Sequence, residues 1–143
     1  MAGTLLILYL DTSALIKLWI PEPESATVKL RVQAATGIAT AAVAYAETRA
    51  ALAALARNRR FGRAGLEAAR KSLDEQWPDI AAIAINDGII RAAGDLAETH
   101  GLRGFDAVHL ACYAQLLRRS PGEPVSFFSF DLRLQRASER LRI

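Results

Sequence analysis

Four acidic residues stand alone in apolar or alanine-rich stretches of this chain, and they are its candidates for chemistry. They are Asp11, Glu47, Asp106 and Asp131. Asp11 directly follows the apolar run Leu5–Leu10, where an ionised carboxylate is costly unless something compensates its charge. Each acid also has a purely structural explanation, because an aspartate can cap a helix or favour its N-terminus and a helical glutamate can simply be exposed. Taken together, the four positions favour a shared chemical role over four separate structural ones.

A shared site for these carboxylates implies a cation, because like charges at close range raise one another's pKa. Carboxylate oxygens, water and substrate phosphates are the ligands that Mg²⁺ or Mn²⁺ prefers, and no cysteine–histidine set in the chain suggests zinc. Such an ion can activate water, hold a phosphate oxygen and stabilise the leaving oxyanion. The sequence therefore predicts metal-assisted hydrolysis of a phosphodiester, whereas the number of ions, one or two, stays open.

The four acids can meet only if the chain forms a parallel sheet, and the alternation of predicted strands and helices favours one. Strands are predicted over 5–10, 38–40, 80–85 and 125–130, and the tail after residue 140 can add an edge strand. Helices are predicted over 13–19, 24–35, 42–58, 63–76, 86–100, 105–118 and 132–140. The segment 24–35 also alternates as a strand would, although Ser25 can cap a helix there and Gly37 can stop it.

This arrangement would bring the acids to one edge of the sheet. Asp11 and Asp131 directly follow predicted strands, at the carboxyl edge where open α/β sheets bind ligands. Asp106 opens a helix whose start is expected on the same side, and Glu47 lies in the second turn of a helix that follows a strand. The predicted fold class is α/β, in a single domain over 1–143.

Composition and length agree with one cytoplasmic globular domain. The 143 residues can bury a core but are few for two domains, and a hydrophobic content of 52% argues against disorder. No segment reaches the ~18 uncharged apolar residues of a membrane helix, and the N-terminus lacks the basic start of a signal peptide. The single cysteine, Cys112, excludes an internal disulfide and is expected to be a small core residue.

Arginines concentrate in three places, and the net charge of +3 permits nucleic-acid binding without demonstrating it. The groups are Arg57, Arg59, Arg60 and Arg63; Arg118 and Arg119; and Arg133, Arg136, Arg140 and Arg142. Each group can be a solvated helix end or face. Guanidinium groups also suit contact with phosphate, so positive charge around an acidic site would let phosphates approach it.

Four short segments contain the candidate acids: LYLDTSAL at 8–15, AYAETR at 44–49, LRGFDAVHLA at 102–111 and FSFDLRL at 128–134. In this order and at these spacings they resemble the PIN-domain ribonucleases and, within them, the VapC-type toxins of bacterial or archaeal toxin–antitoxin pairs. The resemblance covers nearly the whole chain. It implies a PIN-like α/β/α sandwich with a central, mostly parallel sheet of four to five strands.

The resemblance also implies roles for individual residues. The family's acidic metal-binding residues correspond to Asp11, Glu47, Asp106 and Asp131. Asp11 and Asp106 would hold the principal ion, and Asp131 would support a second ion or the outer part of the site. Glu47 would position the attacking water or help to deprotonate it. The family's hydroxyl residues, which can orient carboxylates or water, correspond to Thr12 or Ser13 and to Ser129.

By the same resemblance, the protein is expected to be a Mg²⁺- or Mn²⁺-dependent endoribonuclease that acts as a toxin. The family cleaves single-stranded or structured RNA, often tRNA or ribosomal RNA. A cognate antitoxin inhibits it by laying a C-terminal tail over the site, and toxin dimers are common, so we expect an antitoxin partner and a homodimer. In one departure from the pattern, Leu132 and Arg133 follow Asp131, where similar proteins often carry a further acid. The metal role of Asp131 therefore has weaker support than that of Asp11 or Asp106.

Other functions fit the sequence less well. A haloacid-dehalogenase-type phosphatase needs a second aspartate two residues after the first, where this chain has Ser13. A receiver domain needs paired acids near its first strand and a late lysine after a strand, and the chain lacks both. A PIN-like RNA- or protein-binding module without activity is the remaining alternative, although the presence of all the acids gives no sign of lost activity.

Two further polar residues near the acids have structural interpretations. His109 lies one turn after Asp106 and could face the same side, but a core or surface role is the stronger expectation. Arg49 lies two residues after Glu47 and could contact RNA or the antitoxin, but a plain surface role is expected.

Overall fold

The central sheet of the computed structural model is parallel and has four strands, in the order β3-β2-β1-β4. The structure describes residues 5–58 and 61–141. The strands are β1 (Ile7–Leu10), β2 (Gly37–Ala41), β3 (Ala81–Ile83) and β4 (Val125–Phe128). In the register, Tyr9 of β1 lies between Ala39 of β2 and Phe127 of β4. β1 is therefore an interior strand, which fits its apolar sequence.

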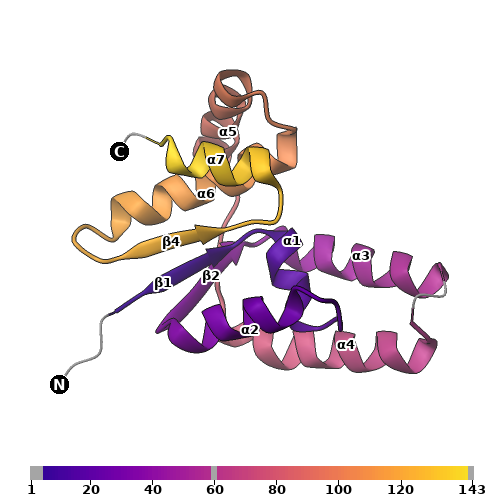
Figure 1. Ribbon diagram of the computed structural model, residues 1–143. Helices are drawn as coiled ribbons and strands as arrows, with labels where there is room; N and C mark the ends of the chain where they lie inside the picture. The colour runs from indigo at the N-terminus through magenta and orange to yellow at the C-terminus, as the bar shows by residue number, and fades with distance from the viewer. Residues whose placement is uncertain (1–4, 59–60, 142–143) are drawn as a thin grey trace.

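Helices cover both faces of this sheet. They are α1 (Thr12–Leu15), α2 (Ser25–Ala34), α3 (Ala44–Arg57), α4 (Arg63–Gln76), α5 (Asp87–His100), α6 (Gly104–Arg119) and α7 (Leu132–Glu139), with 3₁₀ turns η1 (Ile16–Leu18) and η2 (Trp77–Asp79). Helices α1 to α4 lie on one side of the sheet and α5 to α7 on the other (Figure 1). The prediction of an α/β/α sandwich around a parallel sheet is confirmed.

Alternation along β1 divides the core in two, because successive side chains of a strand point to opposite faces. Leu8 and Leu10 are fully buried in the core that α1, α3 and α4 cover, where they pack with Leu52. Tyr9 is fully buried in the opposite core beneath α6. Its ring stacks on Phe127 of β4, with the centroids 5.3 Å apart. This packing fixes the strand whose carboxyl end carries Asp11.

Strand β4 ends at Phe128, two residues earlier than predicted, because side chains take over the next backbone hydrogen bonds. The N–H of Ser129 donates to Gln135 Oε1 at 2.9 Å. The N–H of Phe130 donates to Ser13 Oγ at 3.0 Å. The chain is thereby turned out of the sheet at its carboxyl edge, toward α1 and α7.

Helix α3 begins at Ala44, two residues later than predicted. The N–H of Ala42 instead donates to the carbonyl of Ile83 at 2.9 Å, which continues the pairing of β2 with β3. The segment whose pattern left helix and strand open is a helix, α2. Gly101 ends α5 in the left-handed conformation, at φ 64°, as expected for a glycine stop.

The part of the chain that the structure describes contains no fifth strand. The predicted edge strand falls on the tail, where residues 142–143 lie outside the described residues, as do Arg59, Arg60 and Arg142 of the arginine groups. Among the described residues, no helix combines the length and apolar character that crossing a membrane requires.

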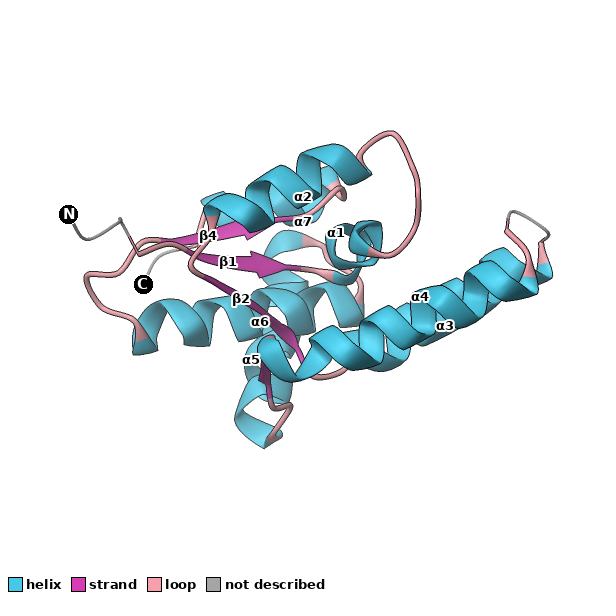
Figure 2. Ribbon diagram, turned by 90° about the horizontal axis from the view of Figure 1, so that it is seen from below, coloured by secondary structure: helices cyan, strands magenta, loops and turns pink. Residues whose placement is uncertain are grey.

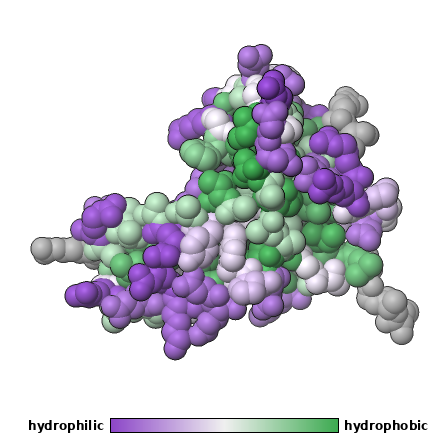
Figure 3. All heavy atoms as spheres, turned by 180° about the vertical axis from the view of Figure 1, so that it is seen from behind, coloured by the Kyte–Doolittle hydropathy of each residue, from purple (hydrophilic) through white to green (hydrophobic). Residues whose placement is uncertain are grey.

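Two further surface features lie on the helices that flank the sheet. Helices α3 and α4 run side by side and extend beyond the sheet (Figure 2), with Leu52 and Leu73 buried in the core that they share. Seen from behind, hydrophobic residues gather on the side of α5 and α6 (Figure 3). A pocket of about 350 Å³ on these helices has Ile90, Phe105 and Val108 in its lining.

Candidate active site

Asp11 lies at the carboxyl end of β1 and is almost fully buried, with 3% of its surface exposed. It caps α1, because Oδ1 accepts the N–H of Ala14 at 3.1 Å. The hydroxyl of Ser13 donates to Oδ1 at 2.7 Å, and that of Ser129 donates to Oδ2 at 2.6 Å. Burial raises the pKa of Asp11, and the hydrogen bonds from Ser129 and Ser13 offset only part of the rise. The helix cap is real, but it does not account for the two hydroxyl contacts.

The two serine hydroxyls are held so that their protons point at Asp11. Ser13 Oγ accepts the N–H of Phe130, and Ser129 Oγ accepts the N–H of Asp131, each at 3.0 Å. Because each oxygen already accepts a backbone proton, its own proton is free for the carboxylate. These bonds also tie the end of β1 to the segment after β4. The structure therefore places both predicted serine hydroxyls on the first aspartate.

Asp106 and Asp131 line a pocket of about 290 Å³ at the same edge, together with Arg103 and Arg133. Asp106 lies in the first turn of α6, and Asp131 is exposed and caps α7 with its side chain. Burial, followed by the charges of Asp131 and Asp11, raises the pKa of Asp106. Three of the predicted acids therefore lie close enough for their charges to interact.

Glu47 reaches this edge from α3, and two donors hold its carboxylate. Thr12 Oγ1 donates to Oε1 at 2.6 Å, and Nε2 of His109 lies 3.0 Å from the same oxygen. Burial alone would raise the pKa of Glu47, but the hydrogen bonds from His109 and Thr12 outweigh it and the pKa is lowered. Glu47 lies in the first turn of α3 rather than the predicted second, because the helix begins late. Of the two hydroxyls after the first aspartate, Thr12 therefore donates to Glu47, whereas Ser13 donates to Asp11.

His109 is buried, as a core residue would be, yet both of its ring nitrogens have polar partners. Its exposed fraction is 2%, and Nδ1 lies 2.8 Å from the hydroxyl of Tyr9. Nε2 lies 3.0 Å from Glu47 and 3.1 Å from Thr12 Oγ1. The spacing of His109 from Asp106 is the sequence signal for this contact. Tyr9 offers none beyond a phenol in an apolar strand.

Two other predicted residues lie outside this edge. Cys112 is fully buried, as predicted for a core cysteine, and burial raises the pKa of its thiol to about 11. Arg49 donates to the hydroxyl of Tyr45 at 3.0 Å on α3. Neither observation links these residues to the acids.

The oxygen donors of the edge suit a hard divalent cation such as Mg²⁺ or Mn²⁺. A bound cation would offset the cost of burying these charges and the repulsion between them, which raise the pKa values of Asp11 and Asp106. Within residues 5–58 and 61–141, no three His, Cys, Asp or Glu side chains already converge closely enough to hold a metal ion. Oδ2 of Asp11 accepts only the bond from Ser129 and keeps a second lone pair, and Oε2 of Glu47 accepts neither of the bonds that hold Oε1. The donor set therefore fits, and binding would require the side chains to draw together.

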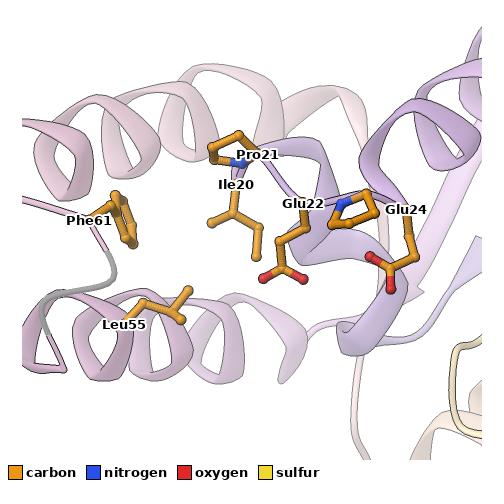
Figure 4. Close-up of a pocket in the computed structure, with 7 residues that line it drawn as sticks. Ile20, Pro21, Glu22, Glu24, Leu55 and Phe61 are labelled. Carbon is orange, nitrogen blue, oxygen red and sulfur yellow. The ribbon is translucent and has the colours of Figure 1, made fainter.

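A separate pocket of about 410 Å³ lies between the segment after η1 and the α3–α4 pair (Figure 4). Figure 4 shows Ile20, Leu55 and Phe61 around it, with Glu22 toward one end. Glu22 forms an ion pair with Lys17, and the lining contains none of the four candidate acids. This pocket is therefore distinct from the carboxylate edge.

Comparison with known proteins adds a family and a fold. The family model described as PIN domain matches residues 8–139. Ribonuclease VapC45 of Mycobacterium tuberculosis (strain CDC 1551 / Oshkosh) is 35% identical over 105 residues, which are 73% of this chain and 73% of that protein.

Two crystal structures share the fold. FitAcB from Neisseria gonorrhoeae superposes with a TM-score of 0.67 at 16% identity and covers 92% of this chain and 93% of that one. Mycobacterium tuberculosis VapC20, a toxin that cleaves the sarcin–ricin loop, has a TM-score of 0.60 at 19% identity, with 87% and 91% covered.

Proposed function

The chain belongs to the PIN-domain family, and on this premise we propose that it is a metal-dependent endoribonuclease, the toxin of a toxin–antitoxin pair. The observation that carries the proposal is the grouping of acids at one edge of the sheet, where Asp106 and Asp131 line one pocket and Ser129 joins Asp11 to the segment that carries Asp131. We propose that the whole chain, 1–143, forms this single domain.

We assign the principal cation, Mg²⁺ or Mn²⁺, to Asp11 and Asp106, with Glu47 and Asp131 completing the metal set. When bound, the ion supplies charge to stabilise the leaving oxyanion and to activate water. Ser13 and Ser129 orient the carboxylate of Asp11 through the hydroxyl protons that they donate. These contacts support an Asp11 carboxylate whose orientation is already set in the metal-free protein.

Glu47 is proposed to orient the attacking water or to take its proton. Both donors that hold it, Thr12 and His109, contact Oε1. Oε2 is therefore free of these bonds and can face the reacting groups. The lowered pKa of Glu47 keeps the carboxylate ionised. This suits accepting a hydrogen bond from water more than taking its proton, because a general base works best with a pKa near the working pH.

Arg103 and Arg133 are proposed to help the RNA backbone approach the acids. Both line the pocket that Asp106 and Asp131 share, and Arg133 donates to the carbonyl of Gly101 at 3.0 Å, which positions its guanidinium. Arg133 belongs to the pair that replaces the further acid often found after the last aspartate. Positive charge at this place offsets repulsion between the acids and phosphate.

The proposed substrate is RNA, of the tRNA or ribosomal class, and the proposed partners are a cognate antitoxin and a second copy of the chain. Relatives named as ribonucleases and a structural neighbour described as a toxin support the RNA and the antitoxin. The homodimer rests on family resemblance alone. The proposed location is the cytoplasm, where those RNA substrates are found.

Cleavage of labelled RNA by the purified chain tests the proposal. We expect cleavage by the wild type with Mn²⁺ and none with EDTA, and a loss of about 10³-fold in rate for the Asp106→Asn variant with Mn²⁺. Asp95→Asn is the matched control, because Asp95 is an exposed acid on α5 outside the site. Cleavage by Asp106→Asn at a rate within about tenfold of the wild type would contradict the catalytic assignment.

The alternative function is an inactive RNA- or protein-binding module. All four acids are present and Asp11 is held by two hydroxyls, which favours the enzyme. Absence of cleavage by the wild type across cellular RNA with Mn²⁺, together with RNA binding that Asp11→Ala leaves unchanged, would favour the module.

A further inference from the structure

A chain of buried hydrogen-bonding groups leads from the core to Glu47. Tyr9 is fully buried in the middle of β1 and places its hydroxyl 2.8 Å from Nδ1 of His109. The other ring nitrogen, Nε2, lies 3.0 Å from Oε1 of Glu47. We propose that Tyr9 and His109 are positioning residues for Glu47, with Tyr9 holding the imidazole in the tautomer that donates to the carboxylate.

The direction of each hydrogen bond follows from the partners. A carboxylate can only accept, so Nε2 must carry a proton to face Glu47 at 3.0 Å. In a neutral imidazole the other nitrogen is then an acceptor. Nδ1 therefore needs a donor, and the hydroxyl of Tyr9 is the group that lies against it. Thr12 fits the same order, because its proton goes to Glu47 and leaves a lone pair toward Nε2.

Glu47 needs such a support because its helix packs on the other face of the sheet from the helix of Asp106. It lies on α3, which covers one face of the sheet, whereas Asp106 lies on α6 over the opposite face. His109 is one turn after Asp106 on α6, so its bond to Glu47 links the two helices across the end of β1. A flexible glutamate side chain is thereby held at a set place relative to the aspartates.

The inference rests on the proposed function, since positioning has a purpose only if Glu47 takes part in hydrolysis. Its first test needs no activity. The chain has two histidines, so ¹H–¹⁵N spectra of the imidazoles in the metal-free protein, assigned with a His100→Asn variant, report the tautomer of His109. We expect the Nε2–H tautomer. A ring protonated at Nδ1 in the wild type would overturn the proposal.

The second test separates positioning from packing by kinetics. We expect Tyr9→Phe to lower kcat by about tenfold or more with KM unchanged, as for other residues that orient a ligand indirectly. Tyr113→Phe is the matched control, because it removes a phenol oxygen from the same aromatic cluster, where its bond goes to the carbonyl of Val125. Equal rates for Tyr9→Phe and Tyr113→Phe would overturn the proposal.

A double variant sharpens the tautomer claim. Gln at position 109 can offer an N–H to Glu47 but has no tautomer to fix, so His109→Gln should keep most of the rate that His109→Leu loses. Adding Tyr9→Phe to His109→Gln should then cost nothing further. A further loss equal to that seen with His109 present would contradict the claim. If the wild type cleaves no RNA at all, the proposed function fails, while the imidazole spectra still decide the tautomer.

Discussion

On one side of the carboxylate edge, Asp11 and Asp106 have pKa values raised by burial, whereas on the other side Glu47 has a lowered pKa because His109 and Thr12 donate to it. We call Asp11, Asp106 and Asp131 the aspartate half of the site, and Thr12, Glu47 and His109 the glutamate half. The aspartate half holds like charges that the protein compensates only in part. In the glutamate half, by contrast, Thr12 and His109 already stabilise the charge of the Glu47 carboxylate.

This difference indicates a division of labour. Partly compensated carboxylates gain most from a cation, because the ion removes both the repulsion and the cost of burial. A carboxylate that already accepts hydrogen bonds from a hydroxyl and an imidazole gains less from a cation, and Oε2 of Glu47, which accepts neither of these bonds, can orient water. The comparison therefore assigns the metal chiefly to the aspartates and the water chiefly to Glu47.

The largest expected effect is the loss of cleavage when the aspartate half is broken. Asp106→Asn should lower kcat by about 10³-fold, because a bound ion contributes several kcal/mol of charge stabilisation and each 1.4 kcal/mol or so is tenfold. Initial rates with saturating Mn²⁺ measure it, beside the Asp95→Asn control. A loss of less than about tenfold would mean that Asp106 does not hold the ion.

The next effect is stabilisation of the fold by the cation. At a Mn²⁺ concentration of about 100 times its Kd, the wild type should gain about 2.7 kcal/mol in free energy of unfolding. Glu47→Gln should keep most of this gain, and Asp106→Asn should lose it. Thermal unfolding with and without Mn²⁺ measures the gain. If both variants lost the same share of this Mn²⁺-induced stabilisation, the ion would depend on both halves alike, which would contradict the comparison.

A smaller effect is expected at the hydroxyl that supports the aspartate half. Ser129→Ala removes the donor to Oδ2 of Asp11, so Mn²⁺ affinity should fall by about tenfold. Calorimetric titration measures the affinity. Ser126→Ala is the control, because Ser126 lies on β4 just before Ser129 and its hydroxyl contacts Arg31 rather than the site. Equal affinities for the two variants would show that Ser129 does not tune the carboxylate.

The smallest effects concern stability without metal, where the two halves should respond with opposite sign. Asp106→Asn removes a charge that folding disfavours, so stability should hold or rise. Glu47→Gln removes a charge that folding favours and should cost about 1 kcal/mol. Urea unfolding in EDTA at neutral pH measures both. A loss of stability in both variants would contradict the comparison.

The same two variants predict a pH dependence. The gain from Asp106→Asn is present above the raised pKa of Asp106 and fades as the pH falls to the ordinary aspartate range. The loss from Glu47→Gln is present above the ordinary pKa of glutamate and fades as the pH falls through the lowered pKa of Glu47. Repeating the urea series at stepwise lower pH therefore brings both variants toward the wild type.

Much of this site can be predicted from the sequence, because its signals are local. Asp11 follows an apolar strand, Asp106 and Asp131 open helices, and the alternation of strands with helices implies the parallel sheet on which they meet. The family resemblance, rather than the local pattern, implies the hydroxyl residues Thr12 or Ser13 and Ser129. Local patterns predict strands and helix ends reliably because they depend on residues close together in the sequence.

Glu47 and Thr12 of the glutamate half are predicted, but the contacts of His109 with Glu47 and Tyr9 could not be predicted in the same way. The bond between Tyr9 and His109 joins residues 100 positions apart, and no local pattern encodes it. The orientation of the His109 ring depends on how α6 packs on β1, which is a tertiary property. The early end of β4 has the same origin, because the side chains of Ser13 and Gln135 capture its backbone donors.

The location of a bound Mn²⁺ tests the division of labour most directly. Crystals grown with Mn²⁺, examined for anomalous scattering, would show where the ion lies. We predict a peak within coordination distance of Asp11 and Asp106 carboxylate oxygens, with Oε1 of Glu47 still bonded to His109. A peak held by Glu47 without these aspartates, or none at saturating Mn²⁺, would contradict the account.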